Sequence, residues 1–234
     1  MDELRRNYHH ELERVRTDLA ALAGRVAEII PRATAVLLDS DLDAAEAIID
    51  GDAEIDAISV EIEERCIQIL ALQAPVAGEL RMVIALLKAV ADVERGADLA
   101  ANICKVARRI YGRELDPKLR GLIAQMGEQA RALYLAAIEA LRENDSAKAA
   151  AVVDMDALLD SLQKQFVQSL IESQASTTAD MQVAVQLAMA SRFYERLGDH
   201  AVHIAERVRY VVTGAVPDHR SPERPADTEE TVGP

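Results

Sequence analysis

The chain has 234 residues, of which 50% are hydrophobic, and it carries a formal net charge of −14 at pH 7. A chain of this length can bury one large or two modest cores. The negative charge repels phosphate backbones and anionic lipid headgroups, so it disfavours nucleic acid as a partner and favours cations and basic protein surfaces. Aromatic residues make up only 3% and Trp is absent, which argues against base-stacking platforms.

Strong helix formers dominate and no segment alternates with a strand period, which predicts an all-α chain. The first expected helix covers about residues 3–38, and Pro31 is the point at which it could kink. Its core stripe keeps the three- and four-residue spacing of a helix face: Leu12, Leu19, Leu22, Val26, Ile29, Ala33 and Leu37.

Two further helices and a short one complete the first half. A short helix over 42–50 should end at Gly51, so that Asp52 caps a long helix reaching about residue 74. The turn over 75–78 then leads into a long helix over about 79–110.

The second half repeats this plan after a boundary at 111–117: a helix to 143, a short helix to 153, a long helix to 172, a turn at 173–178 and a helix over 179–212. Gly214 should end the last helix, and the composition beyond it predicts disorder. We therefore expect two tandem, internally repeated three-helix bundles joined end to end, at residues 1–112 and 113–213. A disordered acidic and proline-rich tail follows at 214–234.

The repeat is visible in the residues themselves. The stretch Glu94-Arg95-Gly96-Ala97-Asp98 recurs as Glu195-Arg196-Leu197-Gly198-Asp199, and Asp52-Ala53-Glu54-Ile55-Asp56 recurs as Asp156-Ala157-Leu158-Leu159-Asp160. Two copies of about half the chain each imply two similar structural units. The recurring residues are mainly carboxylates, so the units should share a site as well as a fold.

Helical spacing predicts where these acids meet. Residues four apart share a helix face, so Asp52 pairs with Asp56, and Glu94 pairs with Asp98 on the next long helix. Asp56 and Asp98 lie equally far from a turn centred near residue 77, and so do Asp52 and Asn102. In an antiparallel hairpin this lets Asp52 and Asp56 face Glu94, Asp98 and Asn102. The second half repeats the construction with four further acids: Asp156, Asp160, Glu195 and Asp199.

Four carboxylates at close quarters repel one another unless a cation lies between them. An oxygen-only donor set suits hard ions, so we expect divalent or trivalent metal ions at both clusters (Mg, Mn, Fe or Zn). The opposing interpretation is that these are solvated surface acids in ordinary ion pairs with neighbours such as Arg95. His203 follows Asp199 by one helical turn and is either an extra ligand or a hydrogen-bonded bystander, whereas His9 and His10 should face solvent.

No catalytic signature accompanies the acids. The sequence has no glycine-rich phosphate loop, no G-x-S-x-G and no Glu-x-x-His pair, so we expect no catalytic residue and no enzyme activity. Two alternatives stay open: a carboxylate-bridged metal-binding bundle with redox or hydrolytic activity, and a purely structural helical scaffold. Cys66 and Cys104 are expected to be buried free thiols. No apolar leader or membrane span is evident, so the expected location is cytoplasmic, without membrane insertion.

Three features together give the chain a resemblance to the PhoU family, the accessory proteins of bacterial phosphate-specific transport. They are the opening Arg6-x-Tyr8-His9-x-Glu11-Leu12, the duplicated three-helix units and the two Glu-Arg-x-x-Asp motifs. The resemblance covers residues 1 to about 213.

The motif of the family extends to E-R-x-x-D-H-x-x-N, and both copies here depart from it. Leu99 replaces the His of the first copy, and His203 replaces the Asn of the second. Both departures leave the acids intact.

The resemblance implies a regulator rather than an enzyme. It implies a negative regulator of phosphate uptake and of the phosphate-starvation response. Such a protein acts between the phosphate ABC transporter, through its ATPase component, and a sensor histidine kinase. It also implies metal clusters on the acidic motifs and a homodimer.

Overall fold

A computed structural model of the chain describes residues 2–176 and 181–215. Within these ranges every regular element is a helix: α1 (Asp2–Asp39), α2 (Leu42–Gln73), α3 (Ala77–Arg109), α4 (Pro117–Glu143), α5 (Ser146–Ser176) and α6 (Met181–Thr213). The all-α prediction is therefore confirmed. Most of the predicted disordered tail, from residue 216 onward, lies outside the described residues. None of the described helices has the length and hydropathy needed to cross a bilayer.

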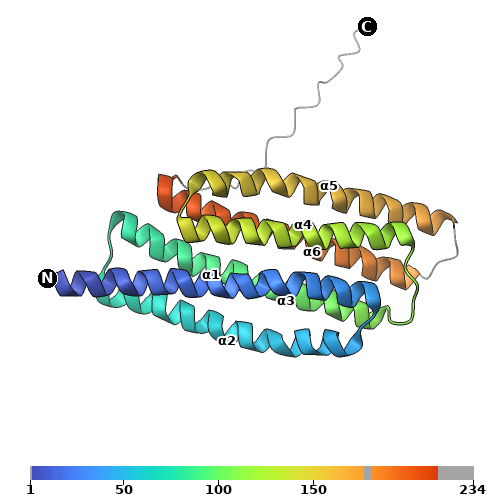
Figure 1. Ribbon diagram of the computed structural model, residues 1–234, viewed down its shortest axis with the longest axis horizontal. Coiled ribbons are helices and arrows are strands. Elements are labelled where there is room, and N and C mark those ends of the chain that lie inside the picture. The colour runs from blue at the N-terminus through green and yellow to red at the C-terminus, as the bar shows by residue number, and fades with distance from the viewer. Residues whose placement is uncertain (1, 177–180, 216–234) are drawn as a thin grey trace, which may run out of the picture.

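The six helices run along the long axis of the molecule, with α2 and α5 on opposite outer sides (Figure 1). Between them, α3 packs on α6 and α1 packs on α4, and one continuous core of buried residues runs through both halves. The prediction that the two units are joined end to end is thus wrong. Their apolar faces bury each other side by side, which removes more apolar surface from water than an end contact can.

The expected break at Gly51 is also absent, since α2 runs through it from residue 42 to 73. Buried Ile48 and Ile55 lie two turns apart, one on each side of Gly51 in the sequence. Buried Val152 and Leu159 lie two turns apart at the corresponding place on α5. This continuous apolar face offsets the cost of one exposed glycine inside a helix, about 1 kcal/mol. The short helices predicted over 42–50 and up to 153 are therefore the first turns of α2 and α5.

The caps repeat as the sequence does. Ser40 and Asn144 both adopt a positive φ, of 58° and 52°, at the ends of α1 and α4. The side chain of Asp41 accepts a hydrogen bond from the amide of Ala44, and Asp145 accepts from the amides of the first turn of α5. Asp41, not Asp52, therefore caps α2. This leaves the Asp52 carboxylate in mid-helix, where it can face α3.

Other sequence expectations are confirmed. The predicted core stripe of α1 is buried or partly buried along its length, and α1 continues through Pro31. Cys66 and Cys104 are buried free thiols, and burial raises their pKa values to about 11 and about 12. Gly214, with a φ of 74°, follows the last residue of α6 as expected.

A buried contact between α1, α4 and α6 joins the two halves. The hydroxyl of Tyr194 donates a hydrogen bond to Thr34 Oγ1 at 2.9 Å. The hydroxyl of Thr34 in turn donates to the carbonyl of Ile30 at 2.9 Å. A Cβ atom on Gly127 would meet Oγ1, Cγ2 and Cβ of Thr34 at 2.3, 2.8 and 3.0 Å. Only glycine lets α4 approach α1 this closely.

The substitution Gly127→Ala should therefore destabilise the protein by about 1–3 kcal/mol, because a β-branched side chain cannot rotate both of its branches away from the added methyl group. Gly121→Ala on the same helix is the control. Gly121 is exposed with nothing within 4 Å of its added Cβ, so alanine should raise stability by up to about 1 kcal/mol. Urea unfolding measures both, and equal shifts would show that α4 does not pack on α1 as described.

Candidate metal-binding clusters

The first predicted cluster lies on the seam between α2 and α3. Asp52 and Asp56 come from α2, and Glu94 and Asp98 come from α3. Asp56 is exposed and the other three are partly buried. The negative charges of the other three all act on Asp52, so the structure brings the four predicted residues into one electrostatic neighbourhood.

Burial and the neighbouring carboxylates raise the pKa of Asp52 to about 6. Burial is the larger cause, followed by the charges of Asp98 and Asp56, while Lys105 acts in the opposite direction. Burial also raises the pKa of Glu94, although Arg95 opposes the shift. A cation placed between such buried, mutually repelling carboxylates would stabilise their ionised forms.

Arg95 provides part of that positive charge. Its Nη1 donates to Asp98 Oδ2 at 3.0 Å, and its Nε lies 3.4 Å from Glu94 Oε2. The Arg95 side chain is 60% exposed, so these pairs are screened and weak. They are the contacts that the solvated-acid interpretation predicts, and they pair the two acids on α3, Glu94 and Asp98. For Asp52, on α2, the positive charge that lowers its pKa is that of Lys105 on α3.

The second predicted cluster lies on the seam between α5 and α6 and has the same form. Burial raises the pKa of Asp156 to about 6, with further contributions from Asp160, Asp199 and Glu195. All four are partly buried. An exposed arginine, Arg192, donates a hydrogen bond to Glu195.

A close approach of α6 to α5 seats the Asp156 carboxylate. A Cβ atom on Gly198 would meet Asp156 Oδ1 at 2.4 Å and Leu159 Cδ2 at 2.7 Å. The glycine of the second motif is therefore required where it stands, directly beside Asp199. The first copy has Ala97 at the corresponding position, so the two seams are related but not identical.

A third group, which the sequence did not predict as a site, lies between α3 and α6. His200 Nδ1 and His203 Nδ1 approach Asp92 Oδ1 at 3.1 and 3.3 Å. The ligand atoms of these three residues lie within 4.8 Å of one another, which makes them a candidate metal-binding group; elsewhere among the described residues, including both acidic clusters, no such group of three occurs.

The sequence did contain a signal for this group. Asp92 lies among Ala89, Val90 and Val93, where helical periodicity assigns a buried face, and a buried acid needs a partner. His203, considered earlier as a ligand beside Asp199, instead faces Asp92. Burial raises the pKa of Asp92, but hydrogen bonds from His200 and His203 outweigh this effect and leave it below its ordinary value. His9 and His10 are exposed, as predicted.

The PhoU domain family matches this chain twice, at residues 19–107 and 123–208. The chain belongs to the PhoU family. The phosphate-specific transport system accessory protein PhoU homolog 2 of Mycobacterium tuberculosis is 36% identical over 215 residues, which are 92% of this chain and 100% of that protein. The PhoU homolog of Pseudomonas putida is 30% identical over 207 residues, which are 88% of this chain and 81% of that protein.

Solved structures agree with the fold. The crystal structure of PhoU from Pseudomonas aeruginosa superposes with a TM-score of 0.84 at 30% identity, over 89% of this chain and 100% of that one. The phosphate transport system regulatory protein PhoU from Streptococcus pneumoniae also gives a TM-score of 0.84, at 26% identity, over 90% of this chain and 99% of that one.

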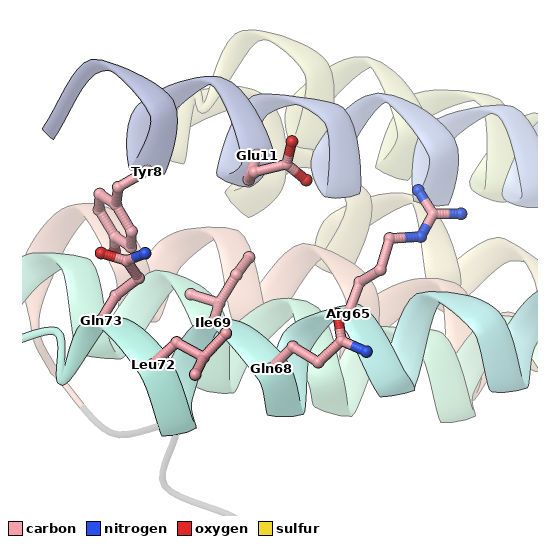
Figure 2. A pocket seen from close by; sticks show the side chains of 7 residues that line it. All are labelled: Tyr8, Glu11, Arg65, Gln68, Ile69, Leu72 and Gln73. Carbon is pink, nitrogen blue, oxygen red and sulfur yellow. The ribbon is translucent and has the colours of Figure 1, made fainter. Parts of the chain in front are cut away.

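The opening motif on which the PhoU resemblance partly rests borders a pocket of about 310 Å³. Figure 2 shows Tyr8 and Glu11 of α1 on one side and residues 65–73 of α2 on the other. The cation among the lining residues, Arg65, is already paired with Asp18 and lies 3.9 Å from Glu61. With the one positive charge among its described lining residues engaged in this way, the pocket is a poor anion site.

The raised pKa values predict how stability depends on pH. Folded Asp52 and Asp156 titrate near pH 6, against an ordinary value of 3.8, so between these values the folded state holds more protons than the unfolded state. Stability of the metal-free protein should therefore fall as the pH rises from about 4 to about 6 and stay lower above it. In chelator, the Asp52→Asn, Asp156→Asn variant should melt higher than wild type at pH 7, and this difference should vanish near pH 4.

The matched control is Asp50→Asn, Asp154→Asn, which makes the same charge change at exposed positions on the same two helices. It should leave the pH dependence of the melting temperature as in wild type. Indistinguishable pH profiles for the two double variants would show that the clustered acids do not repel one another as described.

Proposed function

We propose that this chain is a phosphate-specific transport accessory protein that represses phosphate uptake and the phosphate-starvation response. It acts through the ATPase component of the phosphate ABC transporter and through a sensor histidine kinase. The observation that carries the proposal is the match to relatives of that name over about nine-tenths of this chain, with the paired acidic motifs present in both halves. We propose a non-enzymatic homodimer in the cytoplasm.

The acidic clusters are the proposed metal-binding sites of this regulator. Asp52, Asp56, Glu94 and Asp98 would hold metal in the first unit, and four equivalent acids would do so in the second: Asp156, Asp160, Glu195 and Asp199. Their carboxylates are a hard donor set, which suits Mg, Mn, Fe or Zn ions. The raised pKa values of Asp52 and Asp156 support this proposal, because burial, and after it the neighbouring carboxylates, disfavour the ionised forms that a cation would stabilise.

The chain's own residues determine what such a cation would do. On each seam the acids come from two helices, so a bound cation would relieve repulsion across the seam and favour closed packing of the outer helix. The outer helices α2 and α5 face solvent on their other side. We propose that the solvent-facing sides of α2 and α5 are the regulatory surface for the transporter and kinase. Metal binding at the seams would hold these two helices in the closed packing that presents this surface.

Metal should therefore stabilise the fold by mass action. After chelation, millimolar Mg²⁺ or Mn²⁺ should raise the melting temperature of the wild-type chain, because these ions bind the folded clusters and not the unfolded chain. The Asp52→Asn, Asp156→Asn variant should show a smaller rise than the Asp50→Asn, Asp154→Asn control. An unchanged wild-type melting temperature across millimolar metal would favour the solvated-acid interpretation.

The regulatory role is tested in cells that lack the native copy, with a phosphate-starvation reporter at high phosphate. The quadruple variant Glu94→Ala, Asp98→Ala, Glu195→Ala, Asp199→Ala should lose repression while remaining folded, since it relieves like-charge repulsion and alanine favours helix. The charge-matched control replaces four exposed acids outside the clusters with alanine, and it should repress like wild type: Glu46, Asp50, Glu64 and Asp154.

Two results would contradict these proposals in different ways. A folded quadruple variant that still represses would place the regulatory surface away from the acidic clusters. A wild-type chain that leaves the reporter unchanged would contradict the function itself.

A further inference from the structure

The group on the α3–α6 interface is separate from the acidic clusters and joins the two halves. Positions 92 and 94 lie on different sides of α3, since two residues are more than half a helical turn apart. Asp92 faces α6, whereas the charge of Glu94 acts on Asp52 of α2. Any ligand held at Asp92 would therefore bridge the first unit to the second.

We propose that Asp92, His200 and His203 form a zinc site that locks α3 of the first unit to α6 of the second. Two imidazole nitrogens and one carboxylate oxygen are a donor set of the three-ligand zinc type, with a fourth position left for water. The nitrogen content separates this site from the oxygen-only clusters, because imidazole favours Zn²⁺ over Mg²⁺.

The spacing of the donor atoms fits this metal. Tetrahedral coordination with bonds of about 2.0–2.1 Å places neighbouring donor atoms about 3.3 Å apart. The two Nδ1–Oδ1 separations are 3.1 and 3.3 Å. The ligand atoms of all three residues lie within 4.8 Å of one another, so the two histidines would draw together around one ion.

Unsatisfied polar atoms surround the group and point to a ligand. Asp92 is buried, and its second oxygen, Oδ2, has no hydrogen-bond partner. Arg207 Nη2 lies 3.9 Å from that oxygen, and Arg207 Nε and Glu206 Oε2 are likewise buried without a partner. Buried groups in this condition are costly unless something completes their bonding. A zinc ion with its bound water would supply the positive charge and the hydrogen-bond donor that the two carboxylate oxygens, Asp92 Oδ2 and Glu206 Oε2, lack.

A route from solvent exists on the His203 side. The His203 side chain is 38% exposed, against 13% for His200 and 12% for Asp92. An ion can therefore enter past His203, while the other two ligands are held by the packing of α3 and α6.

The repeat makes this a single site. The corresponding positions in the other half are Leu99, Asn102 and Phe193, which lack the imidazole pair and the carboxylate. This group should therefore hold one zinc ion per chain, independent of the proposed phosphate function.

The experiment uses the full chain, stripped with chelator, in saturating Mg²⁺ so that the oxygen-only clusters are occupied. Titration calorimetry with Zn²⁺ should then detect one site per chain. The variant His200→Asn, His203→Asn should weaken that site by more than about tenfold. The control His9→Asn, His10→Asn removes two exposed histidines of α1 and should bind as wild type does. Equal zinc binding by wild type and the His200/His203 variant would overturn the proposal, as would loss of the site in Glu94→Gln, Asp98→Asn.

A second measurement observes the histidine rings of the wild-type chain directly. Nitrogen NMR of the histidine rings in the wild-type chain should show two Nδ1 signals that shift when one equivalent of Zn²⁺ is added. Assignment by the two double variants should place those signals at His200 and His203. Shifts confined to the other histidines, or no shift, would overturn the zinc site.

Discussion

The constraint on which the rest of the structure depends is the burial of α1, α3, α4 and α6 against one another. This four-helix core is shared by both halves, so it leaves α2 and α5 as outer helices that each contact only two inner ones. The acidic motifs of each half then have one place to meet, on the seam between an outer helix and an inner one. The charged seams and the shared core are consequences of the same packing.

That packing also explains how like charges can be held together. Helical spacing and the buried faces of α2 and α5 fix the height of Asp52 and Asp156, so the carboxylates cannot separate without losing apolar contacts such as those of Ile55 and Leu159. Burial, together with this repulsion, raises the pKa values of Asp52 and Asp156. Exposed arginines compensate only part of it, because their charges are screened by water.

Contacts inside each helical hairpin could be predicted from the sequence, whereas contacts between the hairpins could not. Spacing from the turn near residue 77 was enough to bring Asp56 level with Asp98, because both lie on one antiparallel pair. The prediction failed at Gly51, where a buried face outweighs a local helix breaker. It also failed at Asp92, whose partners lie on α6 of the other half, since no periodicity within one hairpin reports which of its faces the second hairpin will cover. The role of the eight acids as metal ligands, and the division at residues 112 and 213, stay predictions.

The most direct test of the account is the titration of the Asp52 and Asp156 carboxyl groups by carbon NMR in the metal-free protein. If packing holds the acids together, both should titrate near pH 6, and addition of Mg²⁺ or Mn²⁺ should move both titrations to lower pH because a cation favours the ionised form. Titration of both groups near pH 4, unchanged by metal, would contradict the account and show that these are independent, solvated acids.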